Sequence, residues 1–361
     1  MNNNEDIFLK EYSSNDGLEY TASNGIRYLR IAGRDKIDPI LRMKHTAHCF
    51  KAYEVNPMIG CDHRCAYCSI LASTSDDRFS TYVVFDDYPL HLEEFIGQQV
   101  DPRNLTFFFT PQADAFSPIM LESGMTERIL SVFERHQSRF FIFTKGGHNG
   151  GLPADVWSLL EKASTRCQIV VSMGLPGPEL EEILEPGAAS SQERLELLRK
   201  CRNAGIPTSV SVAPFLPLYE DNRPYARSIF SKCKDAGVEA VSIELLKVTR
   251  AGLERVLNLV PEYADSVSQA FDFKNKMEVE WKVAGGETVE RFFTNKEYLA
   301  SQLQMALEVA EELDMSLSVC AEVAKLAGMQ HINRRAASRG YSCAGVQLQL
   351  IQKQTTSIQL Q

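Results

Sequence analysis

Short apolar runs alternate with helix-patterned stretches from Phe50 to about residue 250, and this alternation is the strongest constraint on the fold. It is typical of repeated βα units, in which crossover helices join parallel strands. We therefore expect an α/β fold, a partial (β/α)6 barrel of TIM type, because the repeats are too few for a complete TIM barrel. A doubly wound open sheet is the alternative. The sequence predicts strands at 51–56, 105–110, 139–144, 168–172, 206–212 and 239–245, and helices at 90–99, 126–136, 153–163, 191–204 and 223–236.

The regions that flank this core at 50–250 have other patterns. Residues 1–49 are polar and irregular, and we expect a loosely ordered N-terminal extension. Residues 251–350 are expected to form an α+β C-terminal extension that covers the barrel mouth, and residues 351–361 a flexible tail. Within the C-terminal extension the sequence predicts a hairpin with its turn at Gly285 and Gly286, a helix at 295–313 and a strand at 316–320.

Composition limits the classes of protein to consider. The chain has 361 residues, is 44% hydrophobic and 24% charged, and has no apolar run of the length that a membrane span needs. The N-terminus shows no signal-peptide pattern, and nine scattered cysteines fit a reducing compartment, so we expect a cytoplasmic protein. The net charge of -9 disfavours nucleic acid as a partner, because nucleic-acid binding depends on Lys and Arg. The basic group Arg334, Arg335 and Arg339 is read as a solvated, salt-bridged face.

The spacing Cys61-x3-Cys65-x2-Cys68 indicates a metal site. One short loop offers three thiolates, one fewer than a structural zinc or a ferredoxin cluster takes. An iron–sulfur cluster held by these thiolates would keep one iron open for chemistry. A zinc site with His63 as fourth ligand is the alternative, although no second Cys-x2-Cys is present. Three buried thiols are the weakest interpretation, since Asp62, His63 and Arg64 lie among them.

The stretch from Asn56 to Cys68 resembles the radical SAM superfamily, in which such a loop follows the first barrel strand and carries an aromatic residue before the third cysteine. Tyr67 occupies that aromatic position. The resemblance implies that Cys61, Cys65 and Cys68 hold a [4Fe-4S] cluster, and that the open iron binds S-adenosylmethionine (SAM). It also implies that reduction of the cluster cleaves SAM and releases a 5′-deoxyadenosyl radical.

Further segments resemble the spore photoproduct lyase-like branch of that superfamily. They are Gly60-Cys61-Asp62-His63, Thr144-Lys145, Val171-Ser172, Leu184-Glu185-Pro186-Gly187 with Arg194-Leu195, and the run from Ala204 to Pro217. The resemblance covers about residues 50–250. It implies that Lys145 and Ser172 bind the SAM carboxylate and amino group, that Asp114 serves the methionine ammonium, and that Ala213 and Pro214 contact adenine.

Two departures set this chain apart from photoproduct lyase proper. That enzyme has a relay tyrosine directly after the third cluster cysteine, where this chain has Ser69. It also has a hydrogen-donating cysteine after the second barrel strand, and the segment from Thr110 to Ala115 has none. Repair of thymine dimers is therefore not the expected reaction.

Four residues outside the cluster loop are candidates for substrate chemistry. Cys320 ends a predicted strand, and Cys343 lies beside Tyr341 in a glycine-flanked segment. Either thiol is a candidate hydrogen donor. Cys343, with Tyr341 close to it, is favoured because catalytic groups concentrate on loops. Glu244, at a late strand end, is a candidate acid–base or substrate-contacting residue.

Taken together, these residues predict a radical SAM enzyme that abstracts hydrogen from a small polar substrate of amino acid, nucleoside or sugar type, in specialised biosynthesis. A lyase, an isomerase and a carbon–carbon bond-forming enzyme all fit. The reduced cluster requires an electron donor such as flavodoxin or ferredoxin. Repair or modification of DNA or RNA is the second hypothesis, and a non-catalytic metal-binding scaffold is the third.

Overall fold

The computed structural model describes residues 17–32, 43–45, 51–68, 82–148, 151–271, 276–281 and 287–351. Its main sheet has the strand order β14-β11-β10-β9-β8-β7-β4-β3, and every neighbouring pair is parallel except β3 and β4. The strands are β3 (Met43–His45), β4 (Lys51–Val55), β7 (Thr106–Phe109), β8 (Arg139–Thr144), β9 (Cys167–Ser172), β10 (Thr208–Phe215), β11 (Ala240–Leu245) and β14 (Ser316–Val319).

The order of the parallel strands follows the chain from β4 to β14 without reversal. A doubly wound sheet reverses its order at a switch point, whereas a barrel-type sheet adds each strand beside the previous one. The partial-barrel prediction is therefore confirmed. The sheet gains a seventh parallel strand, β14, from the C-terminal extension.

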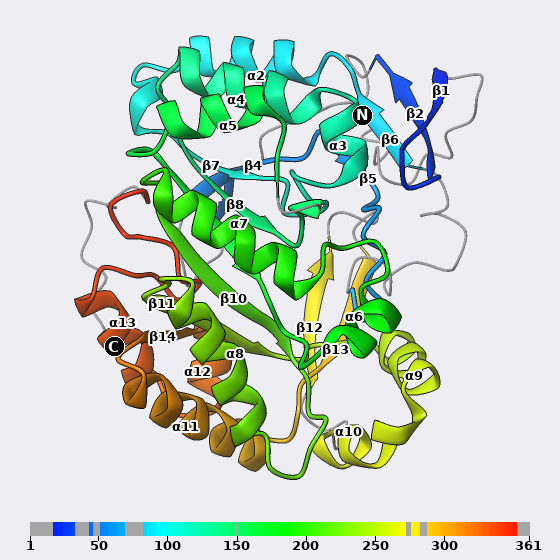
Figure 1. Cartoon of the computed structure of the whole chain (residues 1–361), viewed down its shortest axis with the longest axis vertical. Coiled ribbons are helices and arrows are strands. Elements are labelled where there is room, and N and C mark those ends of the chain that lie inside the picture. The colour runs from blue at the N-terminus through cyan, green and yellow to red at the C-terminus, as the bar shows by residue number, and fades with distance from the viewer. Residues whose placement is uncertain are drawn as a thin grey trace.

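Helices cover the sheet on its outer side (Figure 1). The five predicted core helices are confirmed within a few residues at their ends, and Ser190 caps α7 through a reciprocal capping box with Glu193. The helices are α2 (Tyr88–Gly97), α3 (Pro118–Glu122), α4 (Met125–Arg135), α5 (Ala154–Lys162), α6 (Pro178–Leu184), α7 (Ser191–Asn203), α8 (Arg223–Asp235), α9 (Arg250–Leu259), α10 (Ala264–Ala270), α11 (Lys296–Glu312), α12 (Ala321–Leu326) and α13 (His331–Ser338). Among these described helices, none is long and apolar enough to cross a bilayer.

The prediction that residues 1–49 are irregular is wrong for part of that region. Strands β1 (Leu18–Thr21) and β2 (Arg27–Ile31) form a hairpin that joins β6 (Tyr82–Phe85) and β5 (Met58–Ile59) in a second sheet. β1 has only four residues and all of them are exposed, so its sequence gives too short a pattern to identify a strand. This sheet matters for the site, because β5 leads directly into the three-cysteine loop.

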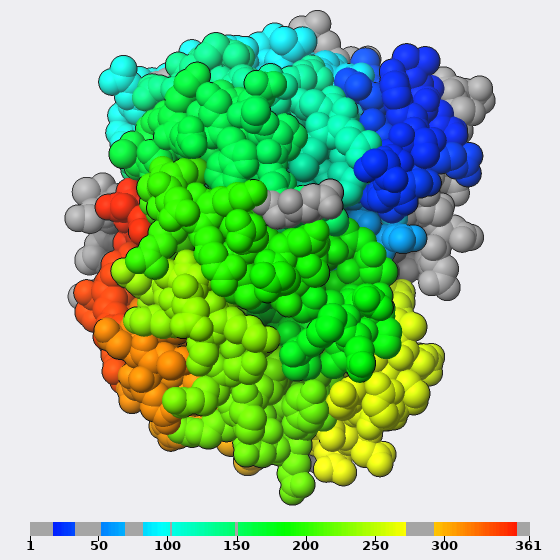
Figure 2. Space-filling model, in the orientation of Figure 1, coloured from blue at the N-terminus to red at the C-terminus, as the bar shows by residue number. Residues whose placement is uncertain are grey.

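The C-terminal extension divides into three parts. Helices α9 and α10 pack their apolar side chains against Ala66 and Tyr67 of the cysteine loop, and Figure 2 shows this segment in yellow on the same side of the molecule as the hairpin in blue. The predicted hairpin is present as β12 (Lys276–Trp281) and β13 (Glu287–Phe292), and the predicted helix as α11. The hairpin turn at Gly285 and Gly286 lies outside the described residues, as do Ser69, Cys49 and residues 352–361.

The last described segment, 340–351, lies at the amino-terminal ends of the strands. Gln168 of β9 donates to the Gly345 carbonyl at 2.9 Å, and Thr106 of β7 donates to the Leu350 carbonyl at 2.7 Å. Both are near the start of their strands, so this segment closes the end of the barrel opposite the mouth. The expectation that the whole extension covers the mouth therefore does not hold for these residues.

Candidate functional site

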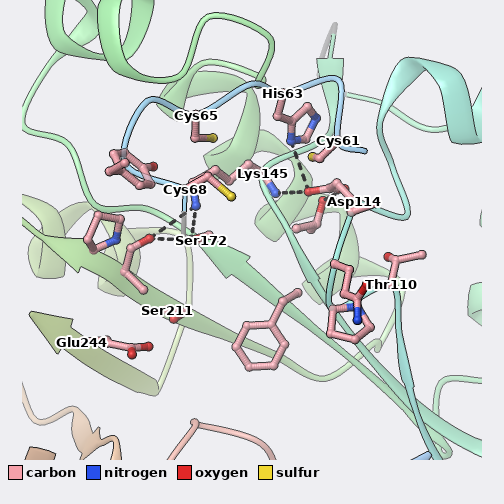
Figure 3. Close-up of a pocket in the computed structure, with 18 of the residues that line it drawn as sticks. Cys61, His63, Cys65, Cys68, Thr110, Asp114, Lys145, Ser172, Ser211 and Glu244 are labelled. Carbon is pink, nitrogen blue, oxygen red and sulfur yellow. Dashed lines mark hydrogen bonds and ion pairs between the residues drawn. The ribbon is translucent and has the colours of Figure 1, made fainter. Parts of the chain in front are cut away.

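A cavity of about 450 Å³ opens at the carboxyl ends of the parallel strands. Its walls carry the three motif cysteines and side chains from the ends of β7, β8, β9, β10 and β11 (Figure 3). Phe108 and Phe143 are part of its apolar lining, and they pack on a small core that includes Val346 and Ile351 of the terminal segment. Active sites of barrel enzymes form at this end of the strands.

The cysteine loop is fixed at both ends by close packing. Gly60 enters it with φ 81°, and a side chain there would meet the Tyr82 ring at 2.9 Å, so only glycine fits. Inside the loop, the Arg64 N–H donates to the Cys61 carbonyl and the Cys68 N–H donates to the Cys65 carbonyl. The loop is thus a pair of tight turns that bring its thiols to one wall of the cavity.

The segment after α6 holds the loop from the other side. The Ala66 N–H donates to the Leu184 carbonyl at 2.8 Å, and the Gly187 N–H donates to the His63 carbonyl at 3.0 Å. At Gly187 a Cβ atom would lie 2.1 Å from the Asp62 carbonyl oxygen. Backbone therefore packs against backbone, which leaves no room for a side chain at residue 187.

We expect Gly187→Ala to displace the cysteine loop. The new Cβ atom would clash with the Asp62 carbonyl oxygen, and relief of this clash moves the backbone that carries the thiols. Forced overpacking of this kind costs about 1–3 kcal/mol. The prediction is a lower free energy of unfolding in urea and a lower iron content after anaerobic reconstitution. Gly177→Ala is the matched control, since Gly177 has extended backbone and a Cβ there meets nothing within 4 Å. Equal stability and iron content in the two variants would contradict this account.

The three thiols fit an iron–sulfur cluster in chemistry and position. Cys61, Cys65 and Cys68 all line the cavity, and the protein packed around them raises the pKa of Cys65 to about 12. The metal-free Cys65 thiol is therefore protonated at neutral pH, and cluster binding would release that proton. Among the described residues, no three His, Cys, Asp or Glu side chains converge on a single ion. A four-iron cluster does not require such convergence, because its thiolates bind different irons.

His63, the alternative zinc ligand, lines the cavity but belongs to no group of three possible metal ligands among the described residues. Its Nδ1 lies 3.4 Å from Asp114 Oδ2, and its ring is buried. Burial lowers the pKa of His63, against the opposing effect of the Asp114 carboxylate. The pair ties the cysteine loop to the end of β7.

Asp114 is a positioning residue in this structure. Its Oδ1 accepts from the Phe116 N–H at 2.8 Å and the Thr144 hydroxyl at 2.7 Å, and its Oδ2 accepts from the Lys145 N–H at 2.6 Å. Both oxygens are thus used within the protein. Asp114 also lines the cavity, and its contact with the methionine ammonium stays a prediction.

The Lys145 ammonium lies between two strand ends. It donates to the Ser172 hydroxyl at 2.9 Å and to the Ala213 carbonyl at 3.3 Å, and it lies 5.7 Å from the centre of the Tyr67 ring. Pro214 completes this wall. The structure therefore brings four distant segments of the chain together at this wall. Their residues are Tyr67, Lys145, Ser172, and the adjacent Ala213 and Pro214.

Beneath Lys145 lies a buried ion pair whose role the sequence motif did not reveal. The Glu185 carboxylate accepts from the Tyr67 hydroxyl and the Arg194 guanidinium, and lies 4.0 Å from the Lys145 ammonium. Burial opposes ionisation of Glu185, but Arg194 and Lys145 outweigh it and hold the pKa of its carboxyl below the usual range. Arg194 also donates to the Ser172 carbonyl at 2.9 Å. The pair links the cysteine loop to the end of β9.

The four substrate-chemistry candidates separate in space. Glu244 lines the cavity and pairs with Lys247, whose ammonium lies 3.8 Å from the Cys320 sulfur. Cys343 and Tyr341 belong to the segment at the opposite end of the strands, which Figure 1 draws in red, away from β5 and the loop after it. The structure does not bring them to the cavity, and we do not propose them as hydrogen donors. Sequence reasoning missed Lys247, because nothing in its surroundings marks a site.

Comparisons with known proteins support the fold. No family model matches the chain. Spore photoproduct lyase complexed with dinucleoside spore photoproduct is similar with a TM-score of 0.57 and 14% identity, over 80% of each chain. A variant of that lyase with bound AdoMet and the same dinucleoside has a TM-score of 0.56 and 15% identity, over 78% of this chain and 79% of the other.

Curated proteins also match in sequence, and two of them represent the matches. Uncharacterized protein Rv2578c of Mycobacterium tuberculosis is 25% identical over 198 residues, which are 53% of this chain and 57% of the relative. Uncharacterized protein ORF301 of Acidianus two-tailed virus is 24% identical over 230 residues, which are 58% of this chain and 72% of the relative. The match thus spans little more than half the length of the mycobacterial protein. What the comparisons establish is that this chain has the fold of spore photoproduct lyase.

Proposed function

We propose that this chain is a radical SAM enzyme that cleaves SAM reductively and uses the 5′-deoxyadenosyl radical to abstract hydrogen from a small polar substrate. One observation carries the proposal: three cysteines of one loop and the Lys145–Ser172 pair line the same cavity at the strand ends. The lyase with the same fold is described with bound AdoMet, which agrees with this assignment. When bound and reduced, the cluster would supply the electron for SAM cleavage.

The protein groups have distinct roles in this proposal. Cys61, Cys65 and Cys68 hold the cluster. Lys145 binds the SAM carboxylate, because its ammonium can donate a charge-assisted hydrogen bond to an anion that enters the cavity. Ser172 assists through its hydroxyl. Tyr67, Ala213 and Pro214 are expected to contact the rest of SAM, the latter two at adenine.

The decisive experiment is anaerobic reconstitution of the full chain with iron and sulfide, followed by dithionite and SAM. Formation of 5′-deoxyadenosine, measured by chromatography and mass spectrometry, would support the proposal. A protein that takes up stoichiometric zinc, holds no labile sulfide and forms no 5′-deoxyadenosine would overturn it and favour the metal-binding scaffold.

We expect Lys145→Met to weaken SAM binding by about 10–100-fold, the scale of a lost charge-assisted hydrogen bond. The check is the dissociation constant of SAM for the reconstituted protein, measured by equilibrium dialysis. Lys325→Met is the control, because Lys325 is an exposed lysine on α12. Equal affinity of the Lys145→Met variant and the wild type would remove Lys145 from the SAM site.

The remaining assignments follow from the same cavity and are proposals too. A flavodoxin or ferredoxin would supply the electron, in the cytoplasm. A nucleic-acid substrate is not proposed, since Arg335 pairs with Glu311 and Arg339 with Asp314. The basic group near the C-terminus is thus a salt-bridged surface.

A further inference from the structure

A second charged group lines the cavity at the end of β11. Glu244 and Lys247 both lie on its wall and form an ion pair with each other. Figure 3 shows Glu244 on the far side of the cavity from Cys61 and Asp114, with Ser172 and Ser211 between. The pair thus lies away from Cys61 and Asp114, at the end of β11, which is the strand beside β10 with its Ala213 and Pro214.

The surroundings of this pair differ from those of an ordinary surface salt bridge. The Lys247 side chain is 15% exposed and the Glu244 side chain 37% exposed. The Lys247 ammonium also lies 5.9 Å from the centre of the Phe293 ring and 3.8 Å from the Cys320 sulfur. Charges in such a partly desolvated place are weakly screened by water, so a ligand with complementary charges would feel them strongly.

The wall formed by the end of β7 carries a sign of functional constraint. Thr110 has φ 56°, a conformation that a β-branched residue rarely adopts, and its buried hydroxyl has no hydrogen-bond partner among the described residues. Strain of this kind clusters at ligand-binding sites. Here the strained turn brings Gln112 to the cavity wall, where its amide offers both a donor and an acceptor.

We propose that the substrate carries an ammonium and a carboxylate close together, as a free α-amino acid does, and that Glu244 accepts from the ammonium while Lys247 donates to the carboxylate. This inference rests on the proposed radical SAM function for its chemistry, since that function requires a substrate beside SAM. Gln112 would contact the part of the substrate that extends across the cavity.

Charge balance selects this class of substrate. A ligand with one charge would engage one partner of the pair and leave the other partly buried and unpaired, which is costly. A ligand with both charges would replace the Glu244–Lys247 ion pair by two ion pairs between protein and ligand. Every charge would then keep a partner. A neutral sugar or nucleoside would leave the internal pair as it is and gain nothing from it.

The test is equilibrium dialysis of the reconstituted protein against carbon-14-labelled L-amino acids, each assayed singly. Methionine is omitted and unlabelled SAM is present in excess, so that binding at the SAM site does not contribute. We expect at least one amino acid to bind the wild type. Glu244→Gln and Lys247→Met should each weaken that binding about tenfold or more. The exposed-site variants Glu254→Gln and Lys325→Met should bind as the wild type does.

Two results would overturn the inference: binding of no labelled amino acid, or binding that both pocket variants retain at wild-type affinity while their circular dichroism melts match the wild type. A parallel assay of 5′-deoxyadenosine with dithionite and SAM separates this failure from failure of the proposed function. If the protein forms 5′-deoxyadenosine but binds no amino acid, the inferred substrate class is wrong and the proposed radical SAM function stands. If the protein binds an amino acid through Glu244 and Lys247 but does not cleave SAM, the proposed radical SAM function is wrong and the binding site stands.

Discussion

Cys65→Ala is expected to prevent assembly of the cluster and to reduce 5′-deoxyadenosine formation by more than about 100-fold, because losing even an outer-shell partner of a metal site costs 10–100-fold. The loop offers three thiolates and the described structure provides no nearby thiol to replace one. Labile sulfide, the iron-to-protein ratio and 5′-deoxyadenosine after dithionite reduction measure the effect. Each of the other two motif cysteines should behave in the same way.

Cys343→Ala is the matched control for this experiment. Cys343 is also a partly exposed cysteine, but it lies at the opposite end of the barrel from the cavity. Its loss should leave iron content and SAM cleavage within about twofold of the wild type, as expected for a residue outside a functional site. If both variants retained full iron content and activity, the three-cysteine loop would not be the cluster site.

The fold was largely predictable because the parallel sheet is buried on both faces. Some of its strands are continuous apolar runs, such as Phe140, Phe141 and Ile142 in β8, and the helices between strands close at glycines with positive φ, Gly205 and Gly237. A buried apolar run does not identify β1, because all of its side chains are exposed. Edge strands of small sheets depend on pairing with neighbours, which a one-dimensional pattern does not record.

The site was predictable where a residue of suitable chemistry lies at the carboxyl end of a predicted strand. Lys145 follows β8 and Ser172 is the last residue of β9, so parallel pairing brings them together without knowledge of the loops. Glycine-flanked, polar surroundings made Cys343 resemble a catalytic loop residue. Those features instead serve the turn in which Gly345 adopts φ 72° and packs against Ser209 and Ser242. Local sequence does not tell which end of a barrel such a turn closes.

Glu185→Gln is expected to lower the free energy of unfolding by about 3–5 kcal/mol, the cost of breaking a buried ion pair from one side. Arg194 is 1% exposed and remains charged at any accessible pH, so the variant leaves a buried guanidinium without its carboxylate. Urea denaturation of the metal-free chain measures the effect. Glu182→Gln, an exposed change on α6, should stay within about 0.5 kcal/mol of the wild type.

The same pair predicts a pH dependence with a defined sign. The pKa of Glu185 in the folded protein is below its ordinary value of 4.5, so its stabilisation is complete above that value and is lost as pH falls through the lower folded pKa. The difference in unfolding free energy between wild type and Glu185→Gln should therefore be constant near neutral pH and shrink below about pH 4.5. Adding Arg194→Met to Glu185→Gln should recover part of the loss, because the double variant buries no unpaired charge. A double variant as unstable as the sum of both single changes would show that the two residues act separately and that the ion pair does not join the cysteine loop to β9.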